Sequence, residues 1–180
     1  SWPMQLAERL TRRGHALAPP TIVARTGWTA DELLAAATAR EGRPFDFVSL
    51  QIGVNDQYRG ADLEDYRSSF RTVLAHAIQR AHEDSRRVVV LSIPDWGVTP
   101  HADGRDRKAV ATEIDRFNAV NRKETSRVGA QYVDVTTASR EAAADPALLA
   151  PDGLHVSGLM YARWAALALP AVLRALHARA

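Results

Sequence analysis

The chain has 180 residues, of which 46% are hydrophobic and 24% charged, and its formal net charge is +2. These values are typical of one globular domain with a sizeable core, and they exclude a chain too polar to fold. The absence of cysteine excludes disulfides and thiol chemistry, and the scattered basic residues do not predict a nucleic-acid partner. No apolar run approaches the ~20 residues of a membrane span.

The first 40 residues predict a helix, a short strand and a second helix. Apolar residues at helical spacing predict a helix over 2–13, with Pro3 in its first turn. A strand is expected at Thr21–Ala24, after a loop that two prolines mark. The next helix, over 29–40, begins with the Thr-x-x-Glu pattern of a capping box.

The rest of the chain alternates apolar strands with amphipathic helices. A nearly continuous apolar run at 45–52 predicts a strand that is buried on both faces. A second buried strand is expected at 88–93 and a last strand at 132–135. Helical spacing of apolar residues predicts three long helices, which begin after Asp62, near Arg107 and after Ser157. This alternation predicts an α/β fold, with a parallel sheet that helices cover on both sides.

Several short motifs fall where the predicted strands end. Gly27 follows the first strand, Gly53-Val54-Asn55-Asp56 the second, and Asp95-Trp96 the third. Asp152 and His155 precede the last helix, which a right-handed crossover sends back from the same edge of the sheet. Because ligands of parallel sheets bind beyond the carboxyl ends of the strands, we expect these residues to share one site.

Among the six histidines, His155 is the strongest candidate for a general base, because Asp152 three residues earlier can bind and orient its ring. His101 is the alternative; it lies in a loop after a strand, but no carboxylate is patterned with it. The other four occupy helices or turns. Asp152 and His155 alone are too few to ligate a metal, and no glycine-rich phosphate loop is present, so neither a metal nor another cofactor is expected.

Together these motifs resemble the SGNH, or GDSL-type, hydrolase superfamily over the whole chain from Trp2. Thr26-Gly27-Trp28-Thr29 is similar to the block whose glycine offers a backbone N–H to an oxyanion. Gly53-Val54-Asn55-Asp56 is similar to the block whose asparagine offers its side-chain amide, and Asp152-Gly153-Leu154-His155 resembles the block with the acid and the base. The stretch Ile93–Gly97 is also similar to many bacterial members.

The resemblance implies a flavodoxin-like, three-layer α/β/α fold and a single domain over 1–180. It implies a serine ester hydrolase of the esterase or lipase type, with a Ser-His-Asp triad. Its catalytic residues in this sequence would be His155 and Asp152, and its oxyanion hole Gly27 and Asn55, with Gly53 and Asp56 in support. The residues alone also allow purely structural roles: Gly27 would form a turn, and Asn55 would bind the backbone of its own loop.

The family's Gly-Asp-Ser block, at the end of its first strand, has no counterpart here. Ser1 lacks a strand behind it, Ser49 and Ser92 lie within predicted strands, and Ser157 is explained as a helix cap. We therefore expect an N-terminally incomplete copy, with the first strand and the nucleophile upstream of Ser1. In the family's strand order 2-1-3-4-5 that strand lies between 21–24 and 45–52, so residues 1–180 alone should fold poorly and lack activity.

Two other function classes remain: a binding protein on the same scaffold without its nucleophile, and an unrelated flavodoxin-like domain with chance motifs. The expected partner is a small-molecule, lipid or carbohydrate ester, with neither nucleic acid nor a membrane span. Trp28, Tyr58 and Trp96 would either line a pocket for an acyl or aryl group or only pack the loops. The oligomeric state and the location stay open, with a cytoplasmic location favoured over secretion.

Overall fold

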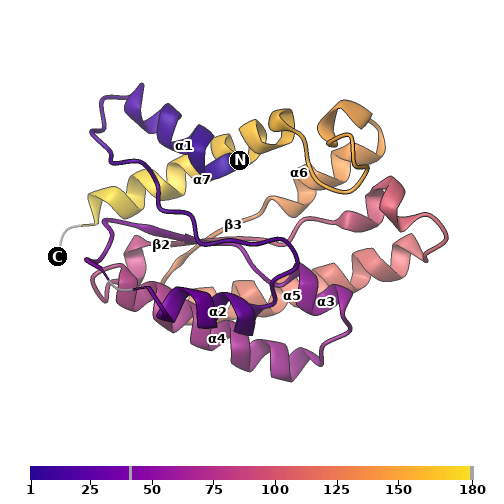
Figure 1. The fold of residues 1–180 in the computed structure, drawn as a ribbon, viewed down its shortest axis with the longest axis horizontal. Coiled ribbons are helices and arrows are strands. Elements are labelled where there is room, and N and C mark those ends of the chain that lie inside the picture. The colour runs from indigo at the N-terminus through magenta and orange to yellow at the C-terminus, as the bar shows by residue number, and fades with distance from the viewer. Residues whose placement is uncertain (41, 179–180) are drawn as a thin grey trace.

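Helices cover both faces of a small parallel sheet in the computed structural model, which describes residues 1–40 and 42–178 (Figure 1). The strands are β1 (Val48–Leu50), β2 (Val88–Leu91) and β3 (Gln131–Val133), in the order β1-β2-β3. Both pairs are parallel, with Val48 opposite Val88 and Leu91 opposite Val133. The α/β prediction is confirmed, and these three strands lie within or next to the predicted runs, although each is shorter than predicted.

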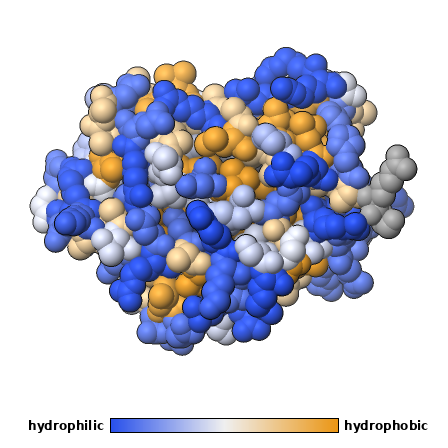
Figure 2. All heavy atoms as spheres, turned by 180° about the vertical axis from the view of Figure 1, so that it is seen from behind, coloured by the Kyte–Doolittle hydropathy of each residue, from blue (hydrophilic) through white to orange (hydrophobic). Residues whose placement is uncertain are grey.

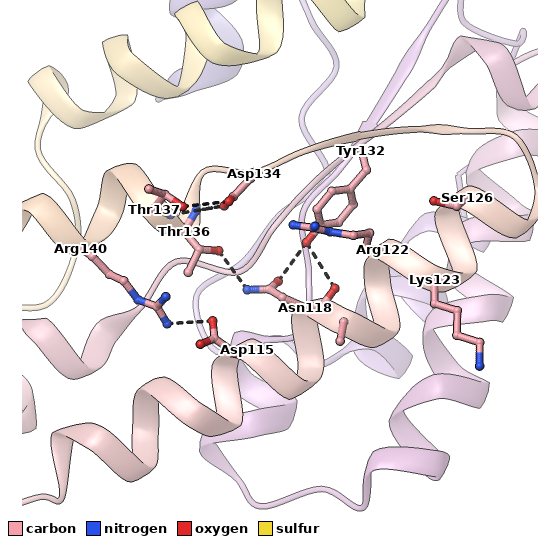
Figure 3. Close-up of a pocket in the computed structure, with 11 residues that line it drawn as sticks. Asp115, Asn118, Arg122, Lys123, Ser126, Tyr132, Asp134, Thr136, Thr137 and Arg140 are labelled. Atoms are coloured by element: carbon pink, nitrogen blue, oxygen red, sulfur yellow. Dashed lines mark hydrogen bonds and ion pairs between the residues drawn. The ribbon is translucent and has the colours of Figure 1, made fainter.

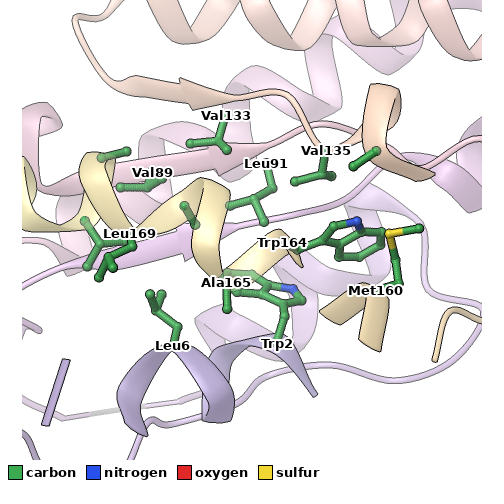
Figure 4. Close-up of a cluster of buried hydrophobic side chains, with 14 of the residues drawn as sticks. Trp2, Leu6, Val89, Leu91, Val133, Val135, Met160, Trp164, Ala165 and Leu169 are labelled. Atoms are coloured by element: carbon green, nitrogen blue, oxygen red, sulfur yellow. The ribbon is translucent and has the colours of Figure 1, made fainter. Parts of the chain in front are cut away.

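The apolar run of β2 sends alternate side chains to the two faces of the sheet, as strand geometry requires. Val89 and Leu91 join a core formed with α1 (Trp2–Thr11) and α7 (Gly158–His177), which Figure 4 shows. Val88 and Val90 join a second core, formed with α2 (Ala30–Thr38), α4 (Leu63–Arg80) and α5 (Arg107–Arg127). The molecule therefore has three layers, with β2 at the centre of the described sheet.

The long helices begin where the capping residues predict. Thr29 caps α2 with both bonds of the capping box, and Asp62 caps α4 by accepting from two backbone N–H groups. Ser157 caps α7 by accepting from the N–H of Met160. Short helices complete the described elements: α3 (Val54–Tyr58), α6 (Thr136–Arg140), and the 3₁₀ turns η1 (Ser85–Arg87), η2 (Trp96–Val98), η3 (Pro100–Ala102), η4 (Glu141–Ala143) and η5 (Pro146–Leu148).

The predicted strand at Thr21–Ala24 is wrong. These residues follow an irregular path outside any strand, and the side chain of Ile22 is 45% exposed. A strand exists only through the ladder that it forms with a neighbour, and no described strand pairs with Thr21–Ala24. Within the described residues, β1 pairs only with β2. The missing first strand stays a prediction.

Helix α7 is long and apolar enough, by length and composition, to cross a membrane. It also packs against α1 and contacts β2 and β3, and its side chains Trp164, Leu169 and Val172 are buried. Core packing therefore accounts for its apolar character. On the face of the molecule in Figure 2, apolar side chains form separate patches among hydrophilic ones.

Candidate active site

The loop before α7 holds Asp152 and His155 together. His155 Nδ1 lies 2.6 Å from Asp152 Oδ2, and Asp152 Oδ1 accepts from the backbone N–H groups of Leu154 and His155. An isolated bridge between Leu149 and Val156 closes the loop, with the N–H of Ala150 donating to the carbonyl of His155 at 2.8 Å. The predicted pairing of Asp152 with His155 is thus present in the structure.

This pairing prepares the imidazole to accept a proton. The backbone N–H of Leu154, together with the His155 ring, holds the pKa of the Asp152 carboxyl down at about 2. An ionised carboxylate only accepts hydrogen bonds, so it places the neutral ring's proton on Nδ1 and leaves the lone pair on Nε2. Among the described residues Nε2 has no hydrogen-bond partner, and the ring's side chain is 51% exposed.

The second half of the site begins at Gly53, directly after the predicted strand that contains β1. Gly53 has φ +118°, and a Cβ there would lie 2.2 Å from the hydroxyl oxygen of Tyr66. That hydroxyl donates toward the side-chain oxygen of Asn121 and the carbonyl of Ile52. Burial raises the pKa of Tyr66 well above its ordinary value, which keeps it a donor. Only glycine fits this turn, which starts α3 and sets the position of Asn55.

Residues of α3 bind the turn that contains Gly27. The side-chain amide of Asn55 donates to the carbonyl of Trp28 at 2.9 Å, and the buried carboxylate of Asp56 accepts from the N–H of Ala30. Burial raises the pKa of Asp56, although the Ala30 hydrogen bond lowers it. The structure therefore brings Gly27, Asn55 and Asp56 together, as the sequence predicts.

Asn55 also binds a loop, as the alternative interpretation proposes, because its amide nitrogen donates a hydrogen bond to the Trp28 carbonyl. An amide nitrogen carries two hydrogens, and the described residues occupy one of them. The second hydrogen can bind a ligand. Structural and ligand-binding uses of Asn55 are therefore compatible.

The segment 94–102 connects the two halves. The Trp96 indole N–H donates to the side-chain oxygen of Gln57 on α3 at 2.8 Å. At the other end of the segment, the N–H of His101 donates to the carbonyl of Gly153 at 3.2 Å. The link through Gln57 was not predicted, because it joins residues far apart in the sequence. It places the Asn55 half and the His155 half at the same edge of the sheet.

The aromatic candidates differ in exposure. Trp96 is buried, so for this residue the packing interpretation is correct, whereas Tyr58 is 47% exposed. The Tyr58 and Trp96 rings lie 5.2 Å apart between centroids, and the His101 ring is 6.1 Å from each. No carboxylate within the described part of the chain binds the His101 ring. This favours His155 over His101 as the base.

None of the described serines is bonded to the His155 ring. The Ser92 hydroxyl accepts from the N–H groups of Val135 and Thr136, and the Ser157 hydroxyl caps α7. Ser1 precedes the first residue of α1 without capping it by a side-chain hydrogen bond. The described residues also hold no group of three histidine or acidic side chains suited to a metal ion.

A groove of about 560 Å³ lies elsewhere, between α5 and the end of β3 (Figure 3). The Asn118 amide bonds the backbone of Ile93 and the hydroxyl of Thr136, and Arg140 bonds Asp115. The Asn118 bonds thus connect α5 with the segments that follow β2 and β3. None of the predicted site residues lines it.

Comparison with known proteins gives one family match. The sequence model of the GDSL-like lipase/acylhydrolase family matches residues 1–163. Curated protein sequences give no match.

Among solved structures, the chain resembles LAE5, an alpha/beta hydrolase enzyme from the metagenome of Lake Arreo, Spain. The TM-score is 0.63 and the identity 23%, over 97% of this chain and 78% of the other. It also resembles an acetyl-xylooligosaccharide esterase from Geobacillus stearothermophilus (TM-score 0.57, 20% identity, 85% and 69% covered). A third similar structure is the OSK domain of Drosophila Oskar (TM-score 0.56, 15% identity, 94% and 84% covered). At these identities the likeness concerns the fold.

Proposed function

The chain belongs to the GDSL-like lipase/acylhydrolase family, and we propose that it is a serine ester hydrolase acting on small-molecule esters. In this proposal His155 is the general base, Asp152 orients it, and Gly27 and Asn55 donate hydrogen bonds to the oxyanion. The observation that carries the proposal is the His155 ring, which Asp152 holds through Nδ1. Its Nε2 has no partner among the described residues and lies at the edge of the sheet where Asn55 lies.

The proposed chemistry follows from these positions. A serine hydroxyl attacks the ester carbonyl while His155 Nε2 takes its proton, and the Asp152 carboxylate stabilises the imidazolium that forms. Negative charge moves to the carbonyl oxygen, where the Asn55 amide and the Gly27 N–H would donate to it. The imidazolium then protonates the leaving alcohol. Water next attacks the acyl group while His155 Nε2 takes its proton, and that proton returns to the serine oxygen as the acid is released.

We place the nucleophile N-terminal to Ser1, in a Gly-Asp-Ser turn at the end of an additional strand. Two observations support this position. Gln5, in the first turns of α1, donates to the carbonyl of Gly158 at the start of α7, so the chain enters α1 close to the His155 loop. The β1 strand pairs on one side only among the described residues, which leaves its other edge able to accept a strand.

The test compares residues 1–180 with the same chain extended by its own upstream coding sequence. We expect that only the extended protein hydrolyses a short-chain aryl ester, and that it reacts with a serine-directed phosphonate on one upstream serine. His155→Ala in the extended protein should abolish this labelling. If residues 1–180 alone unfold cooperatively and react on one of their own serines, the proposed nucleophile is wrong.

The alternative is a binding protein on the same scaffold without a nucleophile. The arrangement of the described serines favours it as the second candidate, because none contacts the His155 ring. Under this alternative the extended protein folds but neither reacts with the phosphonate nor hydrolyses any ester tested. That result would overturn the hydrolase proposal.

A further inference from the structure

Three side chains of α3 and its C-terminal cap bind the turn that contains Gly27, each at a different backbone group. Asn55 binds the carbonyl of Trp28, and Asp56 accepts from the N–H of Ala30. Arg59, which directly follows α3, donates from Nη2 to the carbonyl of Gly27 at 2.6 Å. Arg59 is the one of the three that binds Gly27 itself.

Arg59 also connects this turn to the start of α2. Its Nη1 lies 3.4 Å from the Glu32 carboxylate, and the same carboxylate accepts from the N–H of Thr29 at 2.8 Å. The fork of the guanidinium therefore bridges a carbonyl before α2 and a carboxylate in its first turn. A guanidinium is suited to such a bridge because its planar donors hold a fixed relative geometry.

Besides Arg59, one backbone hydrogen bond closes the turn around Gly27, from the N–H of Trp28 to the carbonyl of Arg25 at 3.3 Å. Gly27 has φ +89°, and the single described atom near the place of a Cβ, chain neighbours aside, is Arg59 Nη2 at 4.0 Å. Glycine rotates about its backbone bonds more freely than other residues, and an oxyanion donor that rotates loses its stabilising effect. The hydrogen bond from Arg59 to the Gly27 carbonyl opposes that rotation.

We propose that Arg59 is a positioning residue that fixes the Gly27 backbone and thereby aims its N–H at the oxyanion. The inference rests on the proposed hydrolase function, and it adds a residue that the family block does not assign. The Arg59 and Glu32 side chains are 53% and 46% exposed, and an ion pair that exposed contributes little to folding. Loss of Arg59 should therefore affect the reaction more than the stability.

The test uses the extended, active protein and three variants. Arg59→Gln should lower kcat about 10-fold, a part of the ~10²–10³ that loss of one oxyanion donor costs, with KM within about twofold. Arg59→Lys, which keeps the charge but not the fork, should fall between parent and Arg59→Gln. The matched control is Arg80→Gln. Arg80 also donates to two backbone carbonyls, those of Gly42 and Arg43, but these precede β1 and so lie away from the carboxyl ends of the strands. It should leave kcat within about twofold.

A second readout needs no catalysis. With ¹⁵N-labelled glycine, the ten glycines of residues 1–180 and the few added upstream give a simple amide spectrum, in which Arg59→Gln should shift or broaden the Gly27 signal and leave that of Gly129 unchanged. The thermal midpoint should stay within about 2 °C of the parent. The inference is overturned by unchanged kcat, by a rise in KM alone, or by a kcat loss that follows a lower midpoint.

Asn55→Ala separates this inference from the proposed function. If Asn55→Ala lowers kcat ~10²–10³-fold while Arg59→Gln does not change it, the inference alone fails. If Asn55→Ala also leaves kcat unchanged, or if the extended parent is inactive, the proposed oxyanion hole fails and the inference fails with it.

Discussion

The two halves of the candidate site are held in opposite ways. The Asn55 half is fixed by contacts between distant parts of the chain: Asn55 with Trp28, Asp56 with Ala30, and Gly53 against Tyr66. The His155 half is held by Asp152 three residues away, and both of these side chains are about half exposed. One half is tied into the core of the fold, and the other is a surface loop whose side-chain bonds are local, although its backbone also binds His101.

The difference corresponds to what each half would do in ester hydrolysis. Oxyanion donors act only if their positions are set before charge develops, so long-range contacts that resist movement are useful there. A general base must take and return protons, so its free ring nitrogen must stay accessible to substrate and water. We therefore expect changes at the buried contacts of the Asn55 half to affect both stability and activity, and changes in the His155 half to affect activity almost alone.

The largest expected effect is that of His155→Ala in the extended protein. Activity on a short-chain aryl ester should fall by about 10⁴-fold or more, because no other described side chain replaces the base. The thermal midpoint should stay close to that of the parent, since the ring is exposed and its bond is local. His101→Ala is the control. An inactive His101→Ala with an active His155→Ala would show that the wrong histidine is assigned.

The next effect tests the rigid half. Gly53→Ala should destabilise the protein by about 4 kcal/mol or more, since the new Cβ would meet Tyr66 in a buried position at an unfavourable φ. Gly60→Ala is the matched control, because Gly60 also has a positive φ, +72°, but open space around it. It should cost about 1 kcal/mol. Urea unfolding measures both; equal losses would mean that backbone strain, and not the Tyr66 contact, is responsible.

The smallest effect concerns pH. The pKa of Asp152 is lowered to about 2 in the folded protein, so its stabilising contribution is present above the unfolded value of 3.8 and is lost as the pH falls toward 2. Asp152→Asn should thus reduce stability slightly at pH 5–7, and the difference should disappear near pH 2. Urea unfolding at several pH values measures this. A difference that grows on acidification would contradict the lowered pKa.

The parts of the structure that follow from local chemistry could be predicted from the sequence. In the capping box of Thr29, and in the Asp152–His155 pair, the two partners are only three residues apart in the sequence. The buried strands are visible as apolar runs. Thr21–Ala24 was mispredicted because its residues favour a strand, while strand formation depends on a neighbour that the local sequence does not contain. A strand-forming sequence pattern is therefore not sufficient, because a strand also needs a neighbouring strand with which to pair.

The contacts that complete the site could not be predicted in the same way. Arg59 and Gln57 are ordinary polar residues at a helix end. Arg59 matters because it binds Gly27, 32 residues away, and Gln57 because it binds Trp96, 39 residues away. The need for glycine at position 53 arises from Tyr66, on another helix. Such requirements depend on which surfaces meet, and one sequence gives no signal for that.

The segment 94–102 has a consequence for how the chain can vary. It is bound at one end to Gln57 and at the other to Gly153, and between them Gly97 has Val110 and Asp95 close to the place of a Cβ. An insertion or deletion of one residue there would separate the two halves of the site. The exposed stretch 18–26 has few such anchors, so it should tolerate changes in length. Homologous chains should therefore differ in length before Gly27 far more than between Pro94 and Ala102.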